Sequence, residues 1–187
     1  MLLLILGLFI WGFAHLIPGL MSGFKSRLIE KFGLNGYKGI LTAALIASVV
    51  FMVFGWRNIQ PPHLYYLGPM VQKIALLMLV VAIYLIVNST EKNRLNRIVR
   101  HPQLTGLIIW AVAHVLMNGD TRAVTLFSGL ALWAIVEIIV INRRDGFWQK
   151  PAAGTMAVEI KSVVKAIVVV AVLTWAHPYF AGVPVHG

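Results

Sequence analysis

The stretch MVQKIALLMLVVAIYLIVN, residues 70–88, holds one charged side chain, Lys73, near its start and is otherwise almost wholly apolar. A helix of about 20 apolar residues crosses the hydrocarbon core of a bilayer. Other apolar runs of similar length lie at 1–17, 39–56, 103–118, 121–141 and 163–180. The sequence therefore predicts an all-α, polytopic membrane protein in which six transmembrane helices form a single domain, 1–187. The limits of the last run stay open, because the polar residues before it can extend the same helix.

Composition excludes most other classes of protein. The chain has 187 residues, of which 59% are apolar and 12% are charged, whereas a soluble domain has roughly 45–50% and about 25%. Its 16 Lys and Arg outnumber 6 Asp and Glu, and the net charge is +10. We expect these cations to contact lipid headgroups and not nucleic acid, because they lie in short segments between apolar runs. The lack of cysteine excludes disulfides, thiolate catalysis, iron–sulfur clusters and thioether-linked haem.

The basic residues also predict an orientation. The connections 18–38, 89–102 and 142–162 are rich in Lys and Arg, whereas 57–69 and 119–122 hold only Arg57 and Arg122. Cytoplasmic loops carry the excess of Lys and Arg, so we expect both termini outside. The first run lacks the features of a cleaved signal and is expected to be a retained helix. Apolar residues at Phe24, Leu28 and Phe32 predict a short amphipathic helix on the inner leaflet.

Few polar side chains lie inside the apolar runs, and two of them are histidines. His15 follows Trp11 by four residues, and His114 follows Trp110 by the same spacing. Two histidines from different helices can hold a b-type haem. The alternative is that each bonds a neighbouring helix and only locks packing. Their Cα atoms are expected to differ in depth by on the order of 10 Å, so a shared iron needs a tilted ring.

Other pairings stay open. His101 matches His15 better in depth, so these two form a competing ligand pair. A proton or hydrogen-bond cluster of His15, His101 and Glu137 is a third possibility. Glu137 lies near a helix end, where it can equally reach the interface or pair with a cation such as Arg143.

Two further residues are candidates for haem contacts. Arg100 is the first candidate to pair with haem propionates, because an arginine fork matches a carboxylate. Together with Arg94 and Arg97 it has the competing role of setting orientation and binding anionic lipid. Trp110 is either an interface anchor or a packing surface for a cofactor ring.

The motif Arg100-His101-Pro102, then Gly106, Trp110, Ala113-His114 and Asn118-Gly119-Asp120, resembles the signature of the NnrU family of bacterial membrane proteins. His15 with Pro18, Arg27, and the Gly36-Tyr37-Lys38-Gly39 segment are similar to that family's first-helix histidine and the start of its second helix. The similarity covers about 1–141. It implies a multi-pass protein of the bacterial inner membrane that supports nitrite and nitric oxide reduction.

The same family is related to 15-cis-ζ-carotene isomerase, a membrane enzyme that uses haem b with histidine ligands. Carried over, that relationship implies His15 and His114 as ligands and His101 as a supporting histidine. The implied function is nitrogen-oxide metabolism or a haem-dependent isomerisation, with a reductase system or a small hydrophobic substrate as partner. The rival interpretation is a non-catalytic membrane accessory protein. A membrane methyltransferase is a distant third: the Arg100–Gly106 segment resembles its RHPxYxG element, but Leu104 replaces the tyrosine.

Overall fold

The computed structural model describes residues 1–152 and 154–181. Every regular element in these ranges is helical, with one isolated bridge between His63 and Asp120. The helices are α1 (Leu2–Leu20), α2 (Ser22–Arg57), α3 (Gly68–Val87), α4 (Pro102–Met117), α5 (Thr121–Asp145) and α6 (Met156–Ala181), with a short 3-10 turn, η1 (Leu95–Arg97), before α4. The predicted all-α class is confirmed, and each predicted apolar run lies within one of the six helices or within one residue of its limits.

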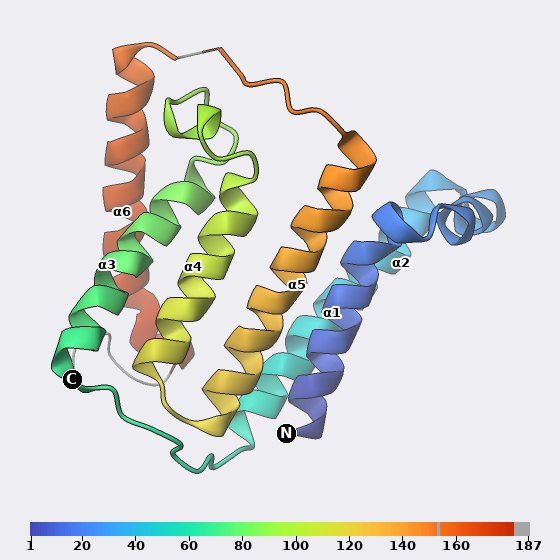
Figure 1. Ribbon diagram of the computed structural model, residues 1–187. Coiled ribbons are helices and arrows are strands. Elements are labelled where there is room, and N and C mark those ends of the chain that lie inside the picture. Colours follow the sequence, from blue (N-terminus) through green and yellow to red (C-terminus); the bar gives the residue numbers. More distant parts are fainter. Residues whose placement is uncertain (153, 182–187) are drawn as a thin grey trace.

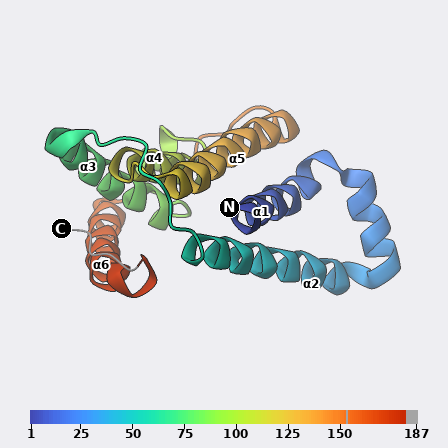
Figure 2. The same ribbon diagram turned by 90° about the horizontal axis from the view of Figure 1, so that it is seen from below.

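The helix α2 consists of two helical parts that meet at Gly33, where φ is 71° and ψ is 170°. A residue with a Cβ rarely adopts this backbone conformation, so glycine allows the break. The part before Gly33 holds the predicted amphipathic segment and the part after it holds the predicted second span, whereas the position on the inner leaflet stays a prediction. Figure 2 shows the part of α2 before Gly33 projecting away from the other helices, while the remainder returns alongside α1.

The helices pack in the spatial order α2, α1, α5, α4, α3, α6, and each contacts the next. Chain order and spatial order therefore differ, because α5 inserts between α1 and α4 (Figure 1). The connections before and after α4 lie at opposite ends. The three basic connections all gather at one end, the top in Figure 1, and α1 begins at the other. This alternation agrees with the charge pattern, whereas which end faces the cytoplasm stays a prediction.

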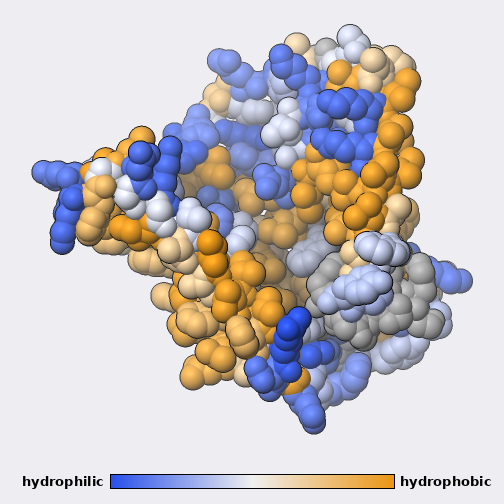
Figure 3. Space-filling view, turned by 180° about the vertical axis from the view of Figure 1, so that it is seen from behind, coloured by the Kyte–Doolittle hydropathy of each residue, from blue (hydrophilic) through white to orange (hydrophobic). Residues whose placement is uncertain are grey.

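Among the residues that the structure describes, four helices are long and apolar enough to cross a membrane: α1, α2, α3 and α5. The helix α4 is also apolar but shorter, with 16 residues, so the exact number of spans stays a prediction. Large apolar side chains face outward, as at Leu2, Phe9 and Leu77, which are 81%, 68% and 67% exposed. Figure 3 shows this apolar surface between hydrophilic residues at the two ends of the molecule. A lipid environment is the physical reason that such a surface is stable.

Small residues bring the helices into close contact. An added Cβ at Gly55 of α2 would lie 2.5 Å from the backbone nitrogen of Leu4 in α1. Ala75, Ala82, Ala111 and Ala134 are fully buried in the other helices. Glycine and alanine at helix interfaces are typical of membrane proteins, in which close van der Waals contact drives association.

Candidate functional site

His15 lies near the end of α1, and its imidazole is held by its own helix. Its Nδ1 is 2.9 Å from the carbonyl oxygen of Trp11. A carbonyl can only accept a hydrogen bond, so Nδ1 donates and carries the proton. The ring centroid lies 4.4 Å from that of Trp11 and 4.7 Å from that of Trp133 in α5. His15 is thus fixed in one tautomer between two indoles.

His114 in α4 repeats this arrangement. Its Nδ1 donates to the carbonyl oxygen of Trp110 over 2.9 Å, and its ring lies 4.4 Å from Trp110 and 4.4 Å from Phe127 of α5. In both histidines Nε2 makes no hydrogen bond with the residues that the structure describes. A metal-ligating histidine almost always donates its other N–H to an oxygen in this way. Each imidazole therefore has the tautomer that a metal ligand needs.

The structure does not bring the two imidazoles together. His15 contacts α5 at Trp133 and His114 contacts it at Phe127. These positions are about 9 Å apart along a helix axis and on faces about 120° apart. Within the described ranges no ring contact joins His15 to His114. The helix α5 therefore lies between the two histidines, and the difference in depth of their Cα atoms stays a prediction.

His101 is engaged elsewhere. It precedes α4, and its Nε2 lies 2.9 Å from Oδ1 of Asn142 near the end of α5. Arg100 and His101 both lie within electrostatic range of Asp145, the last residue of α5. The side chain of His101 thus fastens the start of α4 to the end of α5. The structure describes no contact between His101 and His15 and no group of three His, Asp or Glu residues that could hold a metal ion.

Unpaired polar atoms surround His15. Glu137 of α5 lies within electrostatic range of His15, and its Oε2 is buried with no hydrogen-bond partner among the described residues. The indole nitrogens of Trp11 and Trp133 are buried without a described partner as well, and their rings are 5.4 Å apart. Buried polar atoms without partners are uncommon and often mark a bound water or ligand. Two donors on rings that contact His15, and one acceptor within its electrostatic range, therefore lack a described partner.

Some of these residues were not predicted as part of a site. Phe127 contacts the ring of His114, and Trp133 contacts the ring of His15. These contacts depend on how α5 packs and could not be predicted from the spacing of residues. A sequence signal exists for Trp133, because the spacing Trp11–His15 and Trp110–His114 recurs as Trp133–Glu137. His177 of α6, for which the motifs gave no role, lies within electrostatic range of His114.

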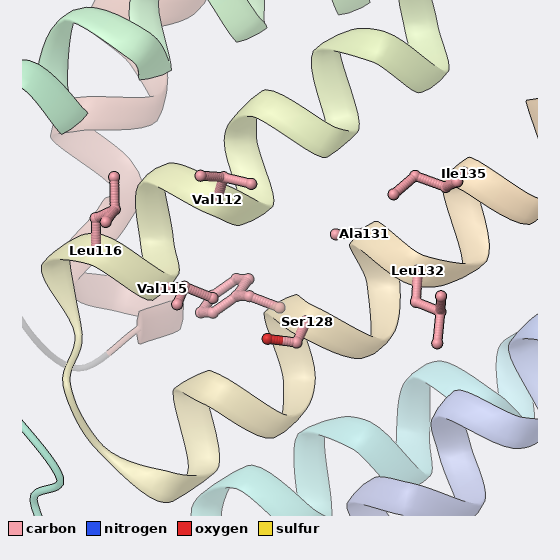
Figure 4. A pocket seen from close by; sticks show the side chains of 8 residues that line it. Val112, Val115, Leu116, Ser128, Ala131, Leu132 and Ile135 are labelled. Carbon is pink, nitrogen blue, oxygen red and sulfur yellow. The ribbon is translucent and has the colours of Figure 1, made fainter.

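A pocket of about 280 Å³ opens between α4 and α5, close to His114. Phe127 forms one wall, and the same ring contacts His114. Figure 4 shows the other lining side chains, which are apolar apart from one hydroxyl: Val112, Val115, Leu116, Ser128, Ala131, Leu132 and Ile135. Ligand pockets are typically about 300–1,000 Å³. This one therefore suits a small apolar molecule or part of a larger ligand.

Fold and site together define a multi-pass helical membrane protein with two helix-anchored histidines flanked by aromatic rings. A family model described as NnrU protein matches residues 3–185. The chain belongs to the NnrU family. The match continues beyond the motifs in 1–141 and includes α6. No curated protein and no solved structure matches the chain.

Proposed function

We propose that this NnrU-family protein binds one b-type haem through His15 and His114 in the bacterial inner membrane, and that it acts in nitrogen-oxide metabolism with a nitrite or nitric oxide reductase system. One observation carries the proposal. Both imidazoles donate Nδ1–H to the carbonyl oxygen four residues earlier and have Nε2 without a described hydrogen bond. A histidine that only fastened helices together would be expected to bond across to a neighbour, as His101 does.

The surroundings of each histidine suit a haem ligand. Indole and phenyl rings flank the imidazoles, and the small residue Gly12 meets only Trp133 where a Cβ would project. When bound, haem b would supply an iron that can change oxidation state and take a small ligand. Arg100 lies at the basic end of the helices, the end towards which His15 is placed, and would pair with a propionate in competition with Asp145.

The position of α5 limits how one iron can be shared. Both α1 and α4 pack against α5, which therefore lies between the two proposed ligands. One iron can be bound by both His15 and His114 only if α1 or α4 moves relative to α5. The pocket between α4 and α5 is smaller than a typical cofactor site. We therefore expect haem binding to separate α4 from α5 or α1 from α5, whereas the protein without haem keeps the observed packing.

A second haem function is a cis–trans isomerisation of a polyene. The apolar lining of the α4–α5 pocket favours it, because Phe127 joins this lining to His114. The non-catalytic alternative, in which the histidines are structural, is favoured by the hydrogen bond between His101 and Asn142.

An optical spectrum of the detergent-purified protein separates these functions. We expect dithionite reduction to give the sharp bands of a low-spin b-type haem in wild-type protein, and their loss in His15→Ala and in His114→Ala. His63→Ala is the matched control, because His63 lies exposed in the connection before α3. A colourless protein after addition of excess haem, or unchanged bands in both variants, contradicts the haem proposal. Loss of the bands in His114→Ala alone contradicts His15 as the second ligand but supports the binding of haem.

A further inference from the structure

A second, strongly basic pocket lies at the end of the molecule where the three basic connections gather. It has a volume of about 330 Å³ and is lined by Arg94, Arg97, Ile98 and Lys150. Arg94, Arg97 and Ile98 come from the connection between α3 and α4, and Lys150 comes from the connection between α5 and α6. Figure 3 shows hydrophilic residues over this end of the molecule, at the top, directly beside apolar helix surface. The pocket therefore lies where a bilayer surface would meet water.

The three cations of this pocket lack acidic partners. Asp145 is paired with Arg144 at 2.7 Å. Glu91 is paired with Lys161 and Lys165 of α6, at 3.5 and 3.0 Å. In the ranges that the structure describes, no ion pair reaches Arg94, Arg97 or Lys150. Positive charge that no described ion pair neutralises favours an anion from outside.

The connection that carries the two arginines is tightly built. Asn96 is 7% exposed, and its Nδ2 donates to the carbonyl oxygens of Asn88, Ser89 and Glu91. Its backbone N–H donates to Oδ1 of Asn93, which is fully buried, over 2.9 Å. These bonds fix the backbone before Arg94 and between Arg94 and Arg97. A fixed backbone reduces the conformational entropy that this connection loses when it binds an anion.

The connection is also fastened to α6, which adds to the support of Arg94 and Arg97. Asn88 Nδ2 donates to the carbonyl oxygen of Ser162 over 3.1 Å. The backbone N–H of Arg94 donates to Oε1 of Glu159 over 2.8 Å. Arg94 also lines the pocket, and no described ion pair reaches its guanidinium.

The exposed apolar side chain of Ile98 favours a ligand with an apolar part over a free inorganic anion. Its side chain is 75% exposed although it lines a pocket with three cations. Exposed isoleucine beside arginine matches a ligand that is both anionic and apolar. Polybasic segments at the membrane surface bind anionic lipids, and an arginine fork matches the oxygens of a phosphate.

We propose that Arg94, Arg97 and Lys150 form a binding site for the phosphate of an anionic phospholipid, with the acyl chain beginning at Ile98. The site is independent of haem, because its residues belong to connections outside the helices that carry His15 and His114. It requires that this end of the molecule faces a leaflet with anionic lipid, which the excess of basic residues at this end favours.

Native mass spectrometry of the intact protein in detergent tests the site, with phosphatidylglycerol, phosphatidylcholine and inorganic phosphate as separate probes. The test protein carries Arg94→Gln, Arg97→Gln and Lys150→Gln. Its matched control carries Lys25→Gln, Arg27→Gln and Lys31→Gln, which remove the same charge from the projecting part of α2. Each cation near a membrane surface contributes roughly a fivefold change in binding. We expect the test protein to lose roughly a hundredfold in affinity for phosphatidylglycerol, and the control to lose far less.

Each outcome decides the proposal. Equal loss in both triple variants means diffuse attraction and overturns a defined site. Equal affinity of the wild-type protein for phosphatidylcholine and phosphatidylglycerol overturns the proposed site as well. Competition by inorganic phosphate at the same concentration as the lipid overturns the lipid as the ligand. If the triple variant unfolds, the single variant Lys150→Gln, on an exposed residue, is expected to weaken binding roughly fivefold, and an unchanged affinity overturns the proposal.

Discussion

The guanidinium carbon of Arg122 lies 4.0 Å from the ring centroid of Trp56, and Nη1 of Arg122 donates to the carbonyl oxygen of Trp56 over 3.1 Å. Trp56 is in the last turn of α2, where backbone carbonyls have no partner within the helix. Arg122 lies in the first turn of α5, and its Nη1 also donates to the carbonyl oxygen of Ile59 over 3.5 Å. One side chain therefore closes the end of α2 and fastens it to α5.

Arg122→Gln is expected to destabilise the protein by about 1–3 kcal/mol, since it removes both a desolvated cation–π contact and the hydrogen bond to Trp56. Thermal unfolding in detergent measures the change. Arg57→Gln is the matched control, because Arg57 ends α2 with no ion pair among the described residues, and we expect a change within about 0.5 kcal/mol. Equal effects of the two substitutions would show that Arg122 does not hold α2 to α5.

The close approach of α1 and α2 predicts that substitution of two glycines in α2 by alanine has opposite effects on stability. In Gly55→Ala the new Cβ would lie 2.5 Å from the backbone nitrogen and 2.8 Å from Cα of Leu4. Backbone atoms cannot turn away, so we expect a loss of about 1–3 kcal/mol. Gly39→Ala meets nothing within 4 Å, and alanine favours a helix over glycine by about 1 kcal/mol. It should leave the melting temperature unchanged or higher. A stable Gly55→Ala protein would contradict the packing of α1 on α2.

Glu91 predicts a dependence on pH at the basic end. The hydrogen bond from Lys165 and then the positive charge of Lys161 hold the pKa of Glu91 below its ordinary value of 4.5. A carboxylate whose pKa is lowered on folding stabilises the protein above its unfolded pKa, and this contribution is lost as pH falls through the folded pKa. Glu91→Gln should therefore lower the melting temperature at neutral pH, and the difference from wild type should fade as pH falls below the ordinary pKa of 4.5 and through the lowered pKa of folded Glu91.

Glu30→Gln is the control for this measurement, because Glu30 lies exposed on the projecting part of α2, with no ion pair to any residue that the structure describes. A difference between Glu91→Gln and wild type that persists in acid would show that Glu91 acts through packing and not through its charge.

Orientation can be tested cleanly, since the natural chain has no cysteine. Gln149→Cys lies in the basic connection after α5, and Gln60→Cys lies in the connection after α2; both positions are exposed. An impermeant thiol reagent added to intact cells should label the second variant and spare the first, while both react after lysis. Labelling of Gln149→Cys in intact cells would reverse the predicted orientation.

The class of fold and the extent of the helices follow from the sequence because bilayer thickness fixes the length of an apolar run. The run 70–88, for example, is α3 (Gly68–Val87) almost without change. The W-x-x-x-H spacing at Trp11 and Trp110 likewise fixes which carbonyl each histidine can reach, since residues four apart lie on one side of a helix. These features depend on local geometry alone.

Only the tertiary structure decided which helices are neighbours. The order α1, α5, α4 arises from the contacts of glycine, alanine and aromatic side chains across helix surfaces, which a linear pattern does not specify. It separates His15 from His114 and surrounds them with Trp133 and Phe127. It also joins Lys150 to Arg94 and Arg97, which are distant in the sequence, in one pocket. Local sequence thus sets the helices and the groups that they carry, whereas packing sets which of those groups meet.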